Sequence, residues 1–318
     1  MSIKIALLSG GISGEREVSL RTGEKIFEAL DKKKYEVFRY DPKTDMERFF
    51  TDASHKKFDL VFPALHGPYG EDGRLQGLLD ILNIPYVFSG CLPSALAMDK
   101  HKAKIIAKTA GLETAEDTIL NRNTQYNFDQ IAERLSFPIV IKPAQSGSSV
   151  GMSIAENKND LEKGIREAFS YDNLLILEKF IKGREFTVAV MGKDNPEALP
   201  VIEIIPKVSK WFDHQAKYEV GGSDEICPAE IPDPLRNRLQ EAALKVFQAV
   251  GCKDLARADF IWSEEDDKLY FLEINTIPGM TATSLAPKAA QAAGMDFPGF
   301  LEKLISYNIK NYEGRLAD

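Results

Sequence analysis

Strand and helix signals alternate over the first third of the chain, and this alternation constrains the fold most. β-Prone runs occupy residues 3–10, 35–41 and 58–65, and helical patterns occupy residues 16–30 and 74–83. Alternation of this kind favours a parallel sheet, because parallel strands need helical crossovers between them. Ligands of such sheets bind beyond the carboxyl ends of the strands, which here carry SGGISGERE and HGPYGEDG. We expect an N-terminal parallel α/β domain over residues 1–97.

The remainder of the chain predicts two α+β lobes. A basic helix that begins in MDKHKAK and ends at Gly111 marks the start of a central lobe, residues 98–183. The C-terminal lobe, residues 184–318, includes a long polar stretch from Lys207 to Ala229 that we interpret as a functional flap.

A helix after this stretch has clear boundary signals. Asp233 is a candidate N-cap with Pro234 at the first helical position, and Gly251 ends the helix. Its apolar stripe predicts a core helix and consists of Leu235, Leu239, Ala242, Ala243, Val246, Phe247 and Val250.

A predicted hairpin near the C-terminal end concentrates the chemistry. LARADFIW and LYFLEIN flank the polar turn SEEDDK. Period-2 geometry places Arg257 and Asp259 on one face of the first strand, and Glu273 and Asn275 on one face of the second. The oxygens suit Mg²⁺ together with nucleotide phosphates, and the guanidinium can neutralise an oxyanion. The alternative is an ordinary hairpin with its polar face in water.

Two other segments indicate nucleotide binding. IVIKPAQSGSSVGM places Lys142 at a strand end before a Gly/Ser loop that can close over phosphates. The P-loop pattern is absent, which argues against a Walker-type fold. ILEKFIKGREFTV places Glu178, Lys179 and Ile181 at a strand end and Glu185 after a turn, so it could contact adenine and ribose or form a solvated edge strand.

The N-terminal loop offers a competing interpretation. Ser9, Gly11 and Gly14 nearly form the dinucleotide fingerprint, with Asp41 at the end of the next strand. That interpretation leaves the acidic hairpin and Lys142 without a role. His66 in the second loop could be a base or a ligand, or a structural residue held by hydrogen bonds.

Composition excludes several classes of protein. The 318 residues carry a net charge of -8, which argues against a nucleic-acid partner. Apolar runs stay below the roughly 18 residues of a membrane span, and the first residues form a strand pattern, so we expect no membrane partner and a cytoplasmic location. The three cysteines are far apart and indicate free thiols.

A series of segments resembles, in this order, the D-alanine:D-alanine ligases of the ATP-grasp superfamily. They are GGISGEREVSL, ALHGPYGEDGRLQGLL, MDKHKAK, IKPAQSGSSVGM, LEKFIKGREFTV, AKYEVGGSDEICPA, ARADF and LEINTIPGMTATSLAPKAA. The resemblance implies an ATP-grasp fold in three α/β domains, ATP as cofactor with two Mg²⁺ ions or Mn²⁺ in their place, D-alanine as substrate, and a homodimer.

The resemblance also implies residue roles. Those near ATP and the metal would be Lys100, Lys142, Ser149, Glu178, Lys179, Ile181, Glu185 and Lys217, with Asp259, Glu273 and Asn275 as metal ligands. Glu15 would hold the first ammonium and connect through Ser148 to Tyr218 on the flap. Arg257 and the Gly279 N–H would bind the oxyanion. Ser284 and the Leu285 N–H would hold the second carboxylate, with His66 also in the substrate site.

The sequence leaves three alternative functions open. A related ligase for another amino acid or peptide would keep the hairpin and the lysines but lose Glu15 and the Lys217–Tyr218 pair, which are both present here. A non-enzymatic nucleotide-binding module or an NAD-dependent dehydrogenase would differ in its response to ATP and D-alanine.

Overall fold

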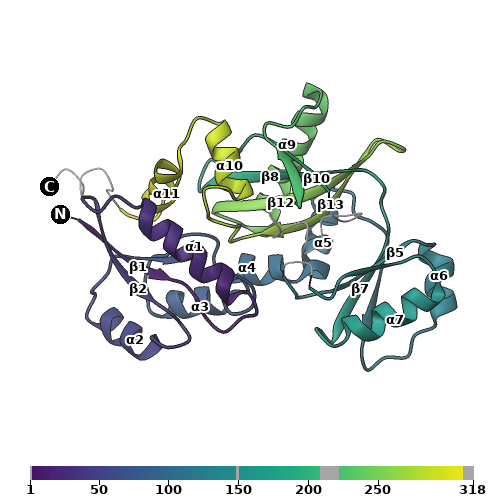
Figure 1. The fold of residues 1–318 in the computed structure, drawn as a ribbon, viewed down its shortest axis with the longest axis horizontal. Helices are drawn as coiled ribbons and strands as arrows, with labels where there is room; N and C mark the ends of the chain where they lie inside the picture. The colour runs from purple at the N-terminus through teal and green to yellow at the C-terminus, as the bar shows by residue number, and fades with distance from the viewer. Residues whose placement is uncertain (1, 148–149, 208–221, 311–318) are drawn as a thin grey trace.

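The computed structural model describes residues 2–147, 150–207 and 222–310, and its strands form three separate sheets (Figure 1). The strands are β1 (Ile3–Leu8), β2 (Tyr35–Tyr40), β3 (Leu60–Pro63), β4 (Asp117–Asn121), β5 (Ile139–Pro143), β6 (Ser153–Ala155), β7 (Leu174–Lys179), β8 (Arg184–Gly192), β9 (Glu197–Ala198), β10 (Ile202–Pro206), β11 (Ser223–Ile226), β12 (Asp254–Ser263) and β13 (Lys268–Asn275). The helices are α1 (Arg16–Ala29), α2 (Met46–Ser54), α3 (Arg74–Ile81), α4 (Cys91–Met98), α5 (Lys100–Thr109), α6 (Phe128–Leu135), α7 (Lys158–Ala168), α9 (Asp233–Val250), α10 (Leu285–Ala292) and α11 (Phe297–Ser306).

The N-terminal sheet has the order β2-β1-β3, and both pairings are parallel. The predicted parallel α/β arrangement is therefore confirmed. The sequence pattern had not indicated α2 and α4. The carboxyl end of β1 leads into the loop that carries Glu15, and the carboxyl end of β3 leads into the loop that carries His66.

The central sheet is antiparallel, with the order β4-β7-β5-β6. Helices α6 and α7 pack together and α7 covers β5 and β6. Alternate residues such as Ile139, Ile141 and Leu177 enter the core beside these helices. Because side chains alternate along a strand, Lys142 and Glu178 lie on the other face of this sheet.

The third sheet has the path β11-β10-β8-β12-β13, with the long helix α9 packed against β8, β12 and β13. Every residue of the predicted apolar stripe on α9 is buried. The predicted N-cap was wrong by one residue, because Asp233 is the first helical residue and Pro232 precedes it as the cap. An extended Pro232 leaves the helical conformation to begin at Asp233, and Pro234 still fits the first turn.

The stretch predicted as an irregular flap contains regular structure at its end. Strand β11 pairs antiparallel with β10, so Ser223–Ile226 belongs to the sheet rather than to a flap. Residues 208–221 of the same stretch lie outside the described residues.

The N-terminal sheet and the third sheet share one core. Leu7 and Phe62 of the first sheet belong to the same buried cluster as Met191 of β8 and Leu304 of α11. Figure 1 shows α1 beside α11, whereas the central sheet lies at the opposite end of the molecule. The chain divisions at residues 97 and 183 stay a prediction. None of the helices in the described ranges combines the length and apolar character that crossing a bilayer requires.

Candidate active site

The face of the third sheet opposite α9 carries the polar residues of the hairpin. Arg257 pairs directly with Asn275, and Asp259 pairs with Glu273, so all four side chains share one face. Ala258 and Phe260 point to the other face and pack with α9. The predicted hairpin and its polar face are confirmed.

A β-bulge interrupts this hairpin beside the acidic pair. Asp259 pairs with Glu273 but the next residue, Phe260, pairs with Phe271, which leaves Leu272 as the extra residue. A bulge redirects side chains locally. Here Leu272 and Glu273, although neighbours in the strand, both line a cavity between this sheet and the central sheet. Phe271 and Ile274 remain in the core on the α9 side.

Arg257 and Asp259 form a buried ion pair. The Nε and Nη2 atoms of Arg257 lie 3.0 and 2.9 Å from the two carboxylate oxygens of Asp259. Asp259 also accepts hydrogen bonds from the Thr187 hydroxyl at 2.5 Å and the Asn275 amide at 3.3 Å. Burial would lower the pKa of Arg257, but Asp259 and then Glu273 raise it, so the guanidinium stays charged. A fixed positive charge therefore lines the large cavity over this face of the sheet.

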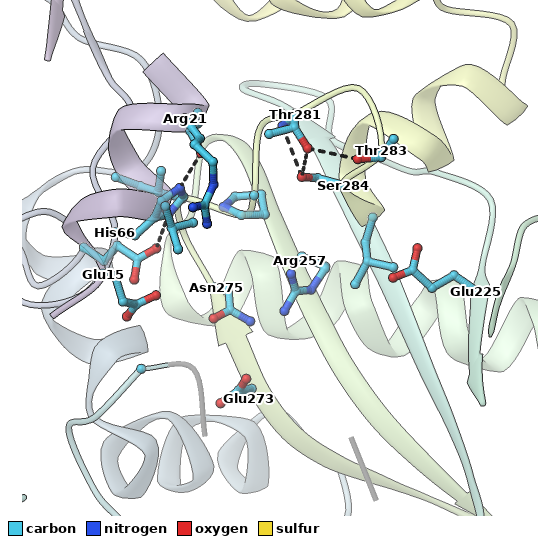
Figure 2. Close-up of a pocket in the computed structure, with 18 residues that line it drawn as sticks. Glu15, Arg21, His66, Glu225, Arg257, Glu273, Asn275, Thr281, Thr283 and Ser284 are labelled. Atoms are coloured by element: carbon cyan, nitrogen blue, oxygen red, sulfur yellow. Dashed lines mark hydrogen bonds and ion pairs between the residues drawn. The ribbon is translucent and has the colours of Figure 1, made fainter. Parts of the chain in front are cut away.

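A cavity of about 340 Å³ lies over this face (Figure 2). Glu15 and His66 line it from the side of α1, Ser284 lines it from the side of α10, and Arg257 and Asn275 lie on the strands between them. Gly279 and Leu285 also line it. The structure thus brings together residues from three distant parts of the chain.

The α10 side of the large cavity is held by hydroxyl groups. Ser284 precedes Leu285, the first residue of α10, and its hydroxyl lies 2.8 Å from the Thr281 hydroxyl. A Cβ at position 279 would lie 2.9 Å from the Ser284 hydroxyl oxygen, so Gly279 permits this close approach.

The α1 side of the large cavity is packed closely against the Gly/Ser loop. A Cβ at Gly147 would lie 2.5 Å from a carboxylate oxygen of Glu15. His66 is buried, with Nε2 3.1 Å from the Thr22 hydroxyl and Nδ1 3.6 Å from Glu71. Ser148 and Ser149 of the loop, and Lys217 and Tyr218, lie outside the described residues.

A second cavity of about 120 Å³ lies between the central sheet and the third sheet. Its walls are largely apolar and include Val140, Ile154, Ile261 and Leu272. Its charged and remaining predicted residues are Lys100, Lys142, Glu178, Lys179, Ile181, Glu185, Asp259 and Glu273. Apolar walls for a flat ring beside lysines for phosphates suit a nucleotide.

Glu178, which lines this second cavity, forms ion pairs with two lysines. Lys142 Nζ lies 2.8 Å from Oε2, and Lys104 Nζ lies 2.7 Å from Oε1. Burial would raise the pKa of Glu178, but Lys142 and Lys104 hold it below its ordinary value.

Lys100 and Glu273 stand where the two cavities meet. Lys100 Nζ lies 3.3 Å from Glu273 and donates a hydrogen bond to the Ser146 carbonyl at 2.7 Å. Glu273 lines both cavities, and a smaller cavity of about 30 Å³ between them is lined by Glu71, Lys100, Gly147, Glu273 and Asn275.

The donor set at this junction fits a divalent ion on its chemistry. Asp259 and Glu273 supply carboxylates, and Asn275 supplies an amide, from paired positions on adjacent strands. Within the described ranges no cluster of three or more His, Cys, Asp or Glu side chains could hold a metal. Two carboxylates and one amide are too few ligands for Mg²⁺ by themselves, so the set would suit this ion if nucleotide phosphates supplied further oxygens.

The interpretation of the N-terminal loop as a dinucleotide site requires Asp41 to bind a ribose, but its carboxylate is already occupied by protein donors. Arg16 donates to both carboxylate oxygens of Asp41, at 2.9 and 2.5 Å, and the Gly11 N–H donates at 2.9 Å. Burial raises the pKa of Asp41, but Arg16 and backbone N–H groups lower it to about 2. This carboxylate stabilises the loop before Glu15.

Several residues of the site were not singled out from the sequence. Arg21, Glu71, Glu225 and Thr281 line the large cavity, and Lys104 contacts Glu178. Glu71, Lys104, Glu225 and Thr281 all belong to quoted motifs, and Lys104 also follows Lys100 by one helical turn, so spacing could have indicated it. Arg21 had no comparable signal.

An antiparallel sheet backed by a long helix and a second antiparallel α+β lobe enclose a cavity lined by apolar residues and lysines, and this arrangement is that of an ATP-grasp enzyme. Comparison with family models gives the D-ala D-ala ligase N-terminus over residues 39–91 and the D-ala D-ala ligase C-terminus over residues 106–306. The chain belongs to the D-alanine–D-alanine ligase family.

Full-length relatives agree with this assignment. The D-alanine–D-alanine ligase of Syntrophobacter fumaroxidans is 46% identical over 97% of this chain and 98% of its own length. That of Desulfotalea psychrophila is 47% identical over 98% of this chain and 97% of its own length.

Solved structures show the same fold. The Bacillus anthracis D-alanine–D-alanine ligase complexed with ATP is 33% identical, with a TM-score of 0.84 over 98% of this chain and 99% of that one. The VanG D-Ala:D-Ser ligase of Enterococcus faecalis is 31% identical, with a TM-score of 0.82 over 97% of this chain and 100% of that one.

Proposed function

We propose that this protein ligates two D-alanines to D-alanyl-D-alanine at the expense of ATP, for peptidoglycan precursor synthesis in cell wall biogenesis. The observation that carries the proposal is the shared position of Glu273, which lines both the second cavity, with its apolar walls and lysines, and the large cavity. A phosphate donor in one cavity can meet a carboxylate in the other at this point.

The reaction divides into two steps. A carboxylate oxygen of the first D-alanine attacks the γ-phosphorus of ATP, the bond to the β,γ-bridging oxygen breaks, and ADP leaves. The amine of the second D-alanine then attacks the acyl carbon and loses a proton. The tetrahedral intermediate collapses with release of phosphate, which carries one oxygen of the original carboxylate.

The residues of the large cavity have roles in binding and charge stabilisation. Glu15 pairs with the first ammonium, and His66 orients the same substrate. Arg257 and the Gly279 N–H stabilise the oxyanion, since donors fixed in advance are effective where charge develops. Ser284 and the Leu285 N–H, at the start of α10, hold the second carboxylate.

The nucleotide residues divide by chemical group. Lys100, Lys142 and Lys217 bind phosphates, with Ser149 of the loop. Glu178, Lys179 and Ile181 contact adenine, and Glu185 binds ribose. Asp259, Glu273 and Asn275 would hold two Mg²⁺ or Mn²⁺ ions, which neutralise charge on the transferred phosphoryl group when bound.

Further parts of the proposal concern the flap and the assembly. Ser148 and Tyr218 connect Glu15 to the flap, which excludes water from the acyl phosphate. The protein works in the cytoplasm, where ATP is available, as a homodimer, and its three domains divide at residues 97 and 183.

Phosphate release from ATP tests this function. We expect release with D-alanine, but only background release with L-alanine or with neither, and a D-alanyl-D-alanine product by mass spectrometry. A mixed dipeptide from equimolar D-alanine and D-serine as the main product would assign the protein to the D-Ala:D-Ser class instead.

A further inference from the structure

Lys104 is a buried lysine that the proposed reaction does not use. It lies on α5 with 1% of its surface exposed. Its ammonium lies 2.7 Å from Glu178 and 3.4 Å from Asp117, and donates to the Ala115 carbonyl at 3.0 Å. All three partners belong to the central sheet or the segment leading into it, whereas α5 packs on β13 and α9.

The central sheet requires a cation at this position. Asp117 of β4 pairs directly with Glu178 of β7, so two carboxylates stand side by side across the strands. Like charges in directly opposed positions destabilise a sheet. Lys104 contacts both, and Asp117 has a second cation in the half-exposed Lys108 at 3.0 Å.

Besides Lys104, the cation that pairs with Glu178 is Lys142, which is itself part of the proposed nucleotide site. It is 4% exposed, and the structure gives it one lysine on each carboxylate oxygen, Lys104 on Oε1 and Lys142 on Oε2. Lys142 also lines the nucleotide cavity. A Lys142 that turns toward a phosphate withdraws its charge from Glu178, and a buried carboxylate without a cation is strongly unfavourable.

We propose that Lys104 is a positioning residue for ATP binding: it keeps Glu178 paired and in place while Lys142 turns to the nucleotide phosphates. This inference rests on the phosphate role proposed for Lys142. Without Lys104, Glu178 would hold Lys142 as its remaining cation, and the nucleotide would have to compete for it.

The test is the affinity for ATP with Mg²⁺, measured by calorimetry in the absence of D-alanine, so that it does not depend on ligation. We expect Lys104→Met to weaken ATP binding about tenfold or more, an ordinary effect for loss of a charged hydrogen bond. Lys108→Met, one turn along the same helix and paired only with Asp117 in this cluster, is the matched control and should bind ATP as the wild type does.

A double variant separates this role from simple support of the fold. In Glu178→Gln the carboxylate no longer competes for Lys142, so adding Lys104→Met should change the affinity by less than about twofold. An equal loss in both backgrounds would overturn the proposal, as would a folded Lys104→Met with wild-type affinity. If Lys104→Met alone fails to fold, the comparison of Glu178→Gln with the double variant still decides, because a large loss there contradicts it. If only the proposed ligation is wrong, the ATP affinities still follow this pattern but D-alanine does not stimulate phosphate release from ATP.

Discussion

The two cavities of the active site are built in different ways. The second cavity, about 120 Å³, is formed largely by residues of two sheets, with apolar walls and with Lys142 paired to Glu178. The larger one, about 340 Å³, has Arg257 and Asn275 of the third sheet in its wall, and α1 and the loops and helix ends that carry Glu15, Gly279 and Ser284 form the rest. Residues within sheets are held rigidly, whereas loops vary more readily. We therefore propose that the nucleotide site is the more rigid of the two and that amino-acid selectivity depends mainly on the loops around Glu15 and Ser284.

The largest effect should come from the residue that both cavities share. Glu273→Gln removes a charge from the proposed metal site and the ion pair with Lys100, so ligation should fall by about 10³-fold or more. The melting temperature should stay close to that of the wild type, and Glu265→Gln, on the exposed hairpin turn, is the control. Ligation at the wild-type rate at low Mg²⁺ would exclude Glu273 from the metal site.

A change confined to the large cavity should affect KM for D-alanine far more than KM for ATP. Glu15→Gln removes the carboxylate proposed for the first ammonium, so KM for D-alanine should rise by about 10- to 100-fold. KM for ATP should change by less than about twofold. The control is Glu17→Gln, because Glu17 is exposed and lies two residues further on, in the first turn of α1. Equal increases in both KM values would indicate a general structural defect.

A change confined to the second cavity, of about 120 Å³, should affect KM for ATP and not KM for D-alanine. Ile154→Ala removes apolar surface from the wall beside the proposed adenine, so KM for ATP should rise by roughly three- to tenfold. The KM for D-alanine should stay unchanged. Steady-state kinetics with each substrate varied in turn measures both, and an effect on D-alanine alone would contradict the assignment of this cavity.

The smallest effect concerns the loop that leads to Glu15. The pKa of Asp41 is lowered to about 2 in the fold, so its ionised form stabilises the native state above its unfolded value near 3.8. This contribution is lost as the pH falls toward 2. Asp41→Asn should therefore melt on the order of 2 °C below the wild type at pH 6, and the difference should close near pH 2. A difference that persists at pH 2 would show that the ionised carboxylate is not its cause.

The sequence was sufficient where a short-range period decides the structure. The pairing of Arg257 with Asn275 and of Asp259 with Glu273 follows from alternation along two adjacent strands. The burial of Leu239 and its companions on α9 follows from the helical period.

Other features depend on contacts between distant residues or on small local differences. Nothing near Leu272 distinguishes a bulge from a regular strand. Lys104 and Glu178 are 74 positions apart, and only the packing of α5 against the central sheet brings them together. The start of α9 was misplaced because Asp233 suits both the cap and the first turn. The roles of Glu15 and Ser284 came from the family resemblance rather than from any local pattern.

Passage of the reaction through an acyl phosphate is tested most directly by following the carboxylate oxygens of D-alanine. With D-alanine labelled with ¹⁸O in its carboxylate, passage through an acyl phosphate transfers one labelled oxygen to the phosphate released in each turnover. Mass spectrometry of that phosphate should show a single ¹⁸O atom per molecule, appearing in step with the dipeptide. Dipeptide formed together with unlabelled phosphate would exclude an acyl phosphate as the intermediate.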